Sequence, residues 1–287
     1  MQNVVADVGV CGRVIYYIEE TAAERNNYRK VIEQLQKIGK GEKTMKITVM
    51  ENEHAFDVAA AWRIIGQMLK KPDSVIGLST GKTTGGMHAI VSEIYEKYPF
   101  DTSKVTLFNV DELTNLDRSY SGSCYTMIYE QIAKNLNIPE ENFIMPPTMS
   151  DDFDRECKLF EQRLAERGGA DLQMLGIGWN GHIGINQPGT PFERQTWVSP
   201  MDPIFEEKVR RETGVGPDYE LGGLTRGIVN IMQTRQVILI AKGESKADII
   251  RQAIQGPITT DIPASVVQLH PNCEILLDKA AASKLIL

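Results

Sequence analysis

The sequence predicts an α/β fold: a Rossmann-like, mostly parallel sheet with helices on both faces and a mobile lid segment. From Met45 onward, short apolar runs alternate with longer stretches of helical periodicity, which is the pattern of a parallel sheet. The apolar runs are rich in β-branched residues, as expected for strands buried on both faces. Glycine-rich or polar loops follow three of these runs, at the place where open α/β sheets bind ligands.

The predicted elements alternate along the chain. Each strand is a short apolar run bounded by glycine, proline or polar residues, and each helix has apolar residues recurring at helical spacing. We expect strands at 47–50, 74–78, 105–110, 143–145, 172–177, 236–241, 265–268 and 274–277. We expect helices at 53–70, 87–98, 120–136, 152–167, 203–212, 225–233 and 245–255.

Residues 45–287 are expected to form a single α/β domain. About 188–223 within it is the expected lid, because glycines, prolines and mixed charges interrupt the regular pattern there. Residues 1–44 offer one plausible helix, Ala22 to Lys37, followed by a linker-like stretch. Two explanations are open for this segment. Either it is an accessory extension, or the translation start is placed too far upstream and Met45 is the real one. We favour the second by a narrow margin.

Composition limits the classes of function. The chain has 287 residues, 42% of them hydrophobic, which is enough for a sizeable core. A formal net charge of −7 argues against non-specific binding to nucleic acid or to anionic membranes. The four cysteines form no C-x-x-C pair, so we expect neither disulfides nor a zinc site. Without a signal peptide or an apolar run near the ~20 residues of a membrane span, a cytoplasmic protein is expected.

The first candidate loop is formed by small and hydroxyl-bearing residues between a strand and a helix. Its backbone N–H groups, its hydroxyls and the start of the helix would all favour a bound phosphate. The spacing from the preceding glycine is one residue short of a nucleotide P-loop. An ordinary strand-to-helix turn is the alternative. The predicted phosphate ligands in this loop are Ser79, Thr80, Gly81, Lys82 and Thr83.

The second candidate is a pair of carboxylates, Asp111 and Glu112, after the strand at 105–110. A carboxylate partly shielded from water at a strand end can act as a general base, because burial raises its pKa. Adjacent side chains point in different directions, so we expect one of the two to act and choose Asp111. A surface turn or a helix cap would explain the pair equally well.

The third candidate is the glycine-rich segment after the strand at 172–177. It carries His182, one of only four histidines, among glycines rather than on an apolar helical face. Asn180 and Gln187 lie close in sequence and could orient the imidazole ring. Neither can supply the negative charge that would favour its protonated form.

Several motifs resemble those of glucosamine-6-phosphate deaminases and occur in the same order. The resemblance runs from about Met45 to Asp278, and the motifs are specific when taken jointly. They lie at Ser79–Thr83, Phe108–Glu112, Gly176–Gly189, Gly243–Ala247 and Ile262–His270.

The resemblance implies conversion of a small phosphorylated amino sugar to a ketose phosphate and ammonia, without metal or organic cofactor. Asp111 would move a proton between C2 and C1 of the opened sugar, and His182 would assist ring opening. The Thr80–Thr83 loop would bind the phosphate, with Lys246 and, less securely, Arg211 adding positive charge. Whether the protein forms a homo-oligomer is left open.

Three positions bear on how far the chain follows this family. Some members have Asp where Asn180 stands, so that difference is mild. Gln187 stands where the family pattern has Glu, and its amide lacks the charge that would stabilise protonated His182. Trp197 and Ser199 replace basic residues that bind a second phosphate in allosterically activated members, so we expect no activation through that site.

Three alternatives accompany this interpretation. A galactosamine-6-phosphate deaminase or isomerase would carry similar loops, since one hydroxyl's orientation is not visible in them. A 6-phosphogluconolactonase-like hydrolase is weaker, because the loop after His182 differs from the lactonase pattern. A non-catalytic sugar-phosphate sensor would be compatible with Gln187.

Overall fold

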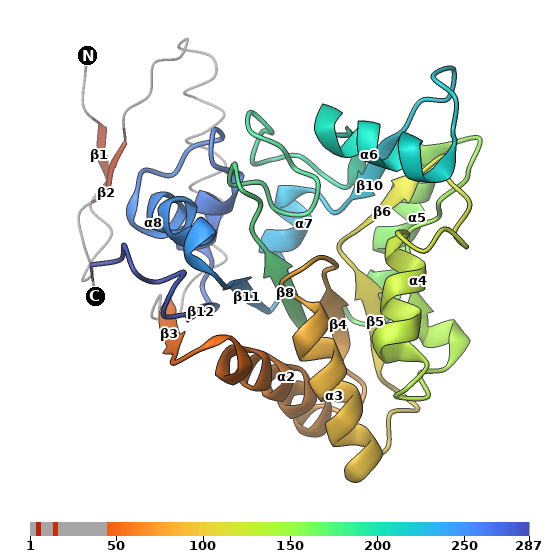
Figure 1. Ribbon diagram of the computed structural model, residues 1–287, viewed down its shortest axis with the longest axis horizontal. Helices are drawn as coiled ribbons and strands as arrows, with labels where there is room; N and C mark the ends of the chain where they lie inside the picture. The colour runs from red at the N-terminus through yellow and green to blue at the C-terminus, as the bar shows by residue number, and fades with distance from the viewer. Residues whose placement is uncertain (1–3, 7–13, 17–44, 287) are drawn as a thin grey trace.

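The computed structural model describes residues 4–6, 14–16 and 45–286. Its centre is a seven-stranded sheet of order β3-β12-β11-β8-β4-β5-β7, in which every neighbouring pair is parallel (Figure 1). The α/β class predicted from the sequence is therefore confirmed. The strands are β3 (Lys46–Met50), β4 (Val75–Leu78), β5 (Thr106–Asn109), β7 (Phe143–Ile144), β8 (Leu172–Gly176), β11 (Gln236–Ala241) and β12 (Cys273–Asp278).

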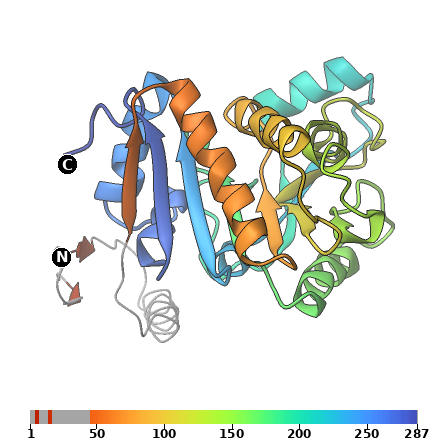
Figure 2. The same ribbon diagram turned by 90° about the horizontal axis from the view of Figure 1, so that it is seen from below.

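Helices cover both faces of this sheet (Figures 1 and 2). Successive residues of a strand point to opposite faces, so Ile238 and Ile240 of β11 pack into one core while Val237 and Leu239 pack into the other. The first core is closed by α2 (Glu53–Lys70), α3 (Gly85–Lys97), α4 (Cys124–Ile128) and a π-helical turn at Tyr129–Ala133. The opposite face is covered by α5 (Phe153–Glu166), α7 (Ile228–Met232), α8 (Ala247–Gln255) and the 3-10 helix η4 (Pro263–Leu269).

Helix α2 shows how local sequence sets an element. The Asn52 side chain caps its start by accepting a hydrogen bond from the backbone N–H of Ala55 at 2.9 Å. Phe56, Ile64 and Met68 lie on one helical face and are fully buried. The helix spans the predicted residues 53–70. Short 3-10 turns occur at Glu140–Asn142 and Glu244–Lys246.

A second, antiparallel sheet lies beyond the carboxyl end of β5. It has the order β6-β10-β9, with β6 (Asp111–Thr114), β10 (Gly222–Thr225) and β9 (Trp197–Pro200). Helix α6 (Pro203–Thr213) contributes Val209 to a small apolar cluster with Leu113 of β6. The predicted lid at 188–223 thus contains a strand and a helix, and its mobility stays a prediction.

Three predicted elements differ from the structure in type or extent. The helix expected at 120–136 consists of α4, Cys124–Ile128, and the π-helical turn Tyr129–Ala133. The strand expected at 265–268 is wrong, because these residues belong to η4, where Pro263 opens the 3-10 helix. A short buried apolar run has no periodicity that would separate the two conformations. The helix expected at 225–233 begins only at Ile228, because Thr225 pairs with Asp111 in the second sheet.

The segment before Met45 is largely outside the described residues, and so is the helix predicted at Ala22 to Lys37. Val4–Ala6 and Val14–Tyr16 form a short antiparallel pair, β1 with β2. Across the described part of the chain, no helix combines the length and the hydropathy needed to cross a membrane.

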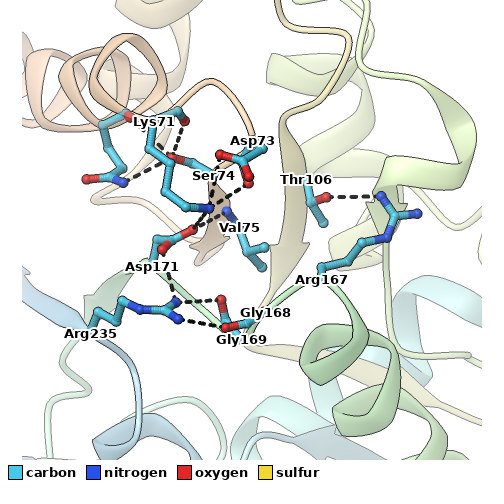
Figure 3. A network of polar contacts seen from close by, with 11 residues as sticks. Lys71, Asp73, Ser74, Val75, Thr106, Arg167, Gly168, Gly169, Asp171 and Arg235 are labelled. Carbon is cyan, nitrogen blue, oxygen red and sulfur yellow. Dashed lines mark hydrogen bonds and ion pairs between the residues drawn. The ribbon is translucent and has the colours of Figure 1, made fainter.

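A polar network ties the amino ends of the central strands together (Figure 3). The buried carboxylate of Asp171, just before β8, accepts the backbone N–H of Val75 at 2.8 Å. It also pairs with Lys71 at 2.9 Å and with Arg235 at 3.0 Å. One side chain therefore joins the starts of β4, β8 and β11 at the edge opposite the loops described below.

We expect Asp171→Ala to lower the free energy of unfolding by about 2–3 kcal/mol, because it leaves the Val75 N–H without a partner in a buried position. Asp73→Ala is the matched control: Asp73 also pairs with Lys71 but is exposed, so little change is expected. Urea unfolding followed by circular dichroism measures both. Equal effects of the two substitutions would contradict this account of the network.

Candidate active site

The three candidate loops follow three neighbouring strands. β4 lies between β8 and β5 in the sheet, and parallel strands end at the same edge, so their loops lie side by side. From β4 the chain continues outward through β5 to β7, and it then returns to β8 and continues the other way through β11 to β12. The sheet order therefore reverses between β4 and β8, and open α/β sheets place their ligand crevice at such a reversal.

The loop after β4 has the backbone of an anion site. Gly81 has a φ of 139°, which favours glycine, and its carbonyl accepts the hydroxyl of Thr84 at 3.1 Å. α3 begins at Gly85 without a side-chain cap, so the N–H groups of its first turn have no side-chain partner. A phosphate at this turn would accept those hydrogen bonds.

The predicted phosphate ligands of this loop differ in what their side chains do. The Ser79 hydroxyl donates to the Met174 carbonyl of β8 at 2.8 Å, so it holds the loop against the neighbouring strand. The Thr80 hydroxyl lies 3.2 Å from the Cys124 thiol. The Lys82 side chain is exposed and has no ion pair within the described residues. Thr80, Thr83 and Lys82 therefore remain candidates for direct contact with a phosphate.

Asp111 is the first residue of β6 and lies two residues beyond the carboxyl end of β5. Its Oδ1 atom accepts hydrogen bonds from the Asn109 amide at 3.1 Å and from the Cys124 thiol at 3.5 Å. Burial raises the pKa of Asp111 to about 6, although both donors oppose this shift. The carboxylate is thus largely charged at neutral pH and partly shielded from water.

The Glu112 side chain is held by hydrogen bonds from the backbone. Its buried carboxylate accepts three backbone N–H groups, from Leu113 at 2.8 Å, Cys124 at 2.9 Å and Tyr125 at 2.6 Å. Burial raises its pKa to about 7. These contacts hold the start of α4, so Glu112 has a structural role, and the assignment of Asp111 as the base stays a prediction.

His182 is oriented by the two amides identified in the sequence. Its Nδ1 atom lies 2.8 Å from Asn180 Oδ1, and Asn180 Nδ2 donates to Gln187 Oε1 at 3.0 Å. The amide oxygen can only accept, so Nδ1 carries the proton and Nε2 has a free lone pair. Burial lowers the pKa of His182, and the charge of Lys246 lowers it further. The imidazole is therefore neutral at neutral pH.

The histidine loop is held against the strand that carries the base. The Ile185 N–H donates to the Thr225 hydroxyl at 3.1 Å, and Thr225 is the β10 residue paired with Asp111. A Cβ atom on Gly184 would lie 3.4 Å from the Val110 side chain, next to Asp111. His182 and Asp111 thus belong to the same end of the sheet.

Lys246 and Arg211 occupy different places. The Lys246 ammonium donates to the Ile177 carbonyl at the end of β8 at 2.7 Å, close enough for its charge to act on His182. Arg211 lies on α6 and lines a surface cavity of about 430 Å³ with Trp179 and Phe205. Within the described residues, no contact joins Arg211 to Lys246 or to the phosphate turn. Arg211 is therefore the least supported of the predicted phosphate ligands.

The positions considered for a second phosphate carry no cationic side chain. The Trp197 indole donates to Asn186 Oδ1 at 3.1 Å, and Ser199 is buried in β9. The absence of activation through this site stays a prediction. Among the residues that the structure describes, no group of three or more His, Cys, Asp or Glu side chains is arranged to hold a metal ion.

Sequence reasoning missed three residues around Asp111. Cys124 contacts both Asp111 and Thr80, Asn109 donates to Asp111, and Thr225 joins Asp111 to the histidine loop. Asn109 could have been considered, because a polar residue two positions before the carboxylate can share its hydrogen bonds. Cys124 and Thr225 gave no local signal, since tertiary pairing alone brings them to the site.

Comparison with known proteins decides the family. Residues 58–275 match the model of the family described as glucosamine-6-phosphate isomerases/6-phosphogluconolactonase. The chain belongs to this family. The resemblance seen in the sequence motifs is thereby confirmed.

Relatives within the family include named enzymes. A glucosamine-6-phosphate deaminase of Clostridium botulinum is 39% identical over 241 residues, covering 84% of this chain and 99% of the relative. One of Thermoanaerobacter pseudethanolicus is 34% identical, covering 83% and 94%. A monomeric glucosamine-6-phosphate deaminase of known structure superposes with a TM-score of 0.78 at 29% identity, covering 84% of this chain and all of that one. A 6-phosphogluconolactonase from Trypanosoma cruzi, at 18% identity and a TM-score of 0.69, shares the fold.

The close approach at Gly178 tests the position of His182. A Cβ atom at residue 178 would overlap the imidazole ring, whereas one at Gly176 would meet nothing within 4 Å. We expect Gly178→Ala to displace the ring and to lower the free energy of unfolding by about 1–3 kcal/mol, because overpacking forces neighbouring atoms apart. Gly176→Ala is the control and should change stability little. Urea unfolding measures both, and a stable Gly178→Ala variant with an unmoved His182 resonance would contradict this geometry.

Proposed function

We propose that this protein is a glucosamine-6-phosphate deaminase, which converts glucosamine 6-phosphate to fructose 6-phosphate and ammonia. The observation that carries the proposal is the placement of a turn suited to an anion, a half-buried carboxylate and a neutral imidazole after three adjacent parallel strands. The named relatives support the same reaction, since the chain covers almost their whole length.

In the proposed reaction His182 opens the sugar ring. Its Nε2 lone pair takes the proton of the anomeric hydroxyl and returns it to the ring oxygen as the C1–O5 bond breaks. A neutral imidazole suits this transfer, because it must accept the proton before donating it. The Asn180 amide holds the ring in the required tautomer.

Asp111 then carries out the isomerisation. Its carboxylate takes the proton from C2 and returns it to C1, while a proton of the C2 ammonium moves to the C1 oxygen. The C1 aldehyde thereby becomes a hydroxymethyl group, and the amine on C2 becomes an iminium. Water adds to the iminium carbon and ammonia leaves, which gives the C2 ketone. A pKa of about 6 makes the Asp111 carboxylate a base that can also release its proton at neutral pH.

Ammonia release from glucosamine 6-phosphate and from galactosamine 6-phosphate tests the proposal directly. We expect the purified protein to release ammonia from at least one, and the comparison identifies the preferred epimer. A non-catalytic sensor is the competing function, because Gln187 lacks the negative charge that a Glu at this position would place next to Asn180. No ammonia from either sugar, together with a raised melting temperature in their presence, would favour that sensor.

Asp111→Asn should reduce turnover by about 10²–10⁴-fold, because it removes the base. In the wild type we expect kcat/KM to fall as the pH drops through about 6, where the Asp111 carboxylate becomes protonated. Exchange of the C2 proton in deuterated water separates this step from binding. The exposed residue Asp117, changed to Asn, is the control. Retained exchange in Asp111→Asn would remove Asp111 from its proposed role.

Gln187→Glu should increase turnover. A carboxylate at this position can still accept the Asn180 amide hydrogen, and its charge would stabilise protonated His182 during ring opening. Gln195→Glu adds the same charge at an exposed position and serves as the control. Steady-state kinetics at several pH values measure the effect. A lower turnover in Gln187→Glu than in the wild type would show that the charge does not assist His182.

A further inference from the structure

We propose that Cys124 is a positioning residue, whose thiol holds the Asp111 carboxylate in place and links it to the phosphate turn through Thr80. The inference rests on the proposed function, because it assigns a role in positioning the base of that reaction. It concerns a residue that touches neither reacting carbon and acts through its two neighbours.

The geometry places the thiol between the two functional groups. Cys124 Sγ lies 3.2 Å from Thr80 Oγ1 and 3.5 Å from Asp111 Oδ1. Both distances fall within the range of hydrogen bonds that involve sulfur. Cys124 is buried and forms no disulfide, so its side chain is available for these two contacts.

The backbone fixes Cys124 independently of its thiol. Cys124 is the first residue of α4, and its N–H donates to the buried Glu112 carboxylate at 2.9 Å. Ser123 caps the same turn by accepting the Thr126 N–H at 3.1 Å. The sulfur is therefore held by a rigid turn. Replacing the side chain should leave this backbone arrangement intact.

The thiol has one proton for two neighbours. Burial raises the pKa of the Cys124 thiol well above its usual value, so the S–H form persists at neutral pH. When S–H donates to Asp111, the sulfur can accept the hydroxyl proton of Thr80. A phosphate oxygen at the turn would compete with sulfur for that hydroxyl proton. Binding of a phosphate at the turn would thus change the hydrogen bonds of the Cys124 sulfur, which lies 3.5 Å from Asp111 Oδ1.

Asn109 and Cys124 hold the same carboxylate oxygen from two directions. Asn109 lies in the buried end of β5 and donates its amide to Asp111 Oδ1, while the thiol approaches from α4. Two donors on one oxygen fix the carboxylate rotamer and favour its charged form. Loss of the thiol would leave Asp111 with the amide alone, in a site where burial already disfavours the charge.

The other ionisable groups near Asp111 have partners of their own. Glu112, its neighbour in β6, accepts three backbone N–H groups. Arg226, which follows the paired residue Thr225, is directed to Glu161 of α5 at 3.0 Å. His182, on the loop after β8, is directed to Asn180. The thiol and the Asn109 amide are thus the side chains that set the state of Asp111.

The experiment compares Cys124→Ala and Cys124→Ser with the wild type, and uses Cys157→Ala as a control because Cys157 is a buried thiol on α5. Cys124→Ala should lower kcat/KM at pH 6 by about 3- to 10-fold, the loss expected for one hydrogen bond to the base. The acid limb of its pH profile should move to higher pH. Cys124→Ser keeps a donor, so its profile should return towards that of the wild type.

A direct titration keeps the test independent of the proposed function. The Asp111 carboxyl resonance, assigned by its loss in Asp111→Asn, is followed by carbon-13 NMR against pH in each variant. We expect the titration midpoint to rise in Cys124→Ala and to remain unchanged in Cys157→Ala, even if no sugar phosphate is deaminated. An unchanged midpoint and acid limb in folded Cys124→Ala would overturn the proposal and leave the thiol a packing role.

Discussion

The parallel pairing of β4 with β8 on one side and β5 on the other is the constraint on which the site depends. Three side chains of these strands and their flanks secure it at different levels. Asp171 binds the Val75 N–H at the amino ends, the Gln173 amide donates to the Met174 and Leu78 carbonyls in the middle, and Ser79 donates to Met174 at the carboxyl ends. A slip of one residue between β4 and β8 would break the contacts of Asp171 with Val75, of Gln173 with Leu78 and of Ser79 with Met174, and would move the loops apart.

Glycine makes the central contact possible. A Cβ atom on Gly77 would overlap both the Gln173 amide and the Phe108 ring, which reach across β4 from its two neighbours. Because Gly77 has no side chain, the side chains of Gln173 from β8 and Phe108 from β5 can both lie over β4 at this position. The same residue weakens the strand entropically, and the Gln173 amide nitrogen contributes hydrogen bonds to the Leu78 and Met174 carbonyls at this level of the sheet.

Much of this arrangement could be predicted from local sequence. Alternation of apolar runs with helical periodicity predicted the parallel sheet, and apolar residues at helical spacing predicted the helix at 53–70. The three loops were recognisable because glycine and polar residues followed apolar runs. These features depend on neighbours within a few residues, where the periodicity of strands and helices operates.

The rest depends on contacts between distant residues. β6 is a strand because Asp111–Thr114 pairs with Gly222–Thr225, more than a hundred positions later in the chain. Cys124 reaches Asp111 because Glu112 holds the start of α4, which local patterns do not reveal. At 265–268 the apolar run was compatible with a strand, and only the packing of η4 against α8 and the sheet selects the 3-10 helix.

The histidine site shows how orientation and charge can be separated. In the relay from Gln187 through Asn180 to His182, the Asn180 amide nitrogen donates to Gln187 Oε1 and the Asn180 oxygen accepts from His182 Nδ1. The imidazole tautomer is thus fixed without any ionised group. Burial and the Lys246 charge lower the pKa of His182, while Asp202 at the start of α6 opposes them. Because Asp202 belongs to the predicted lid, movement of α6 would change the electrostatic balance at His182 without disturbing the relay.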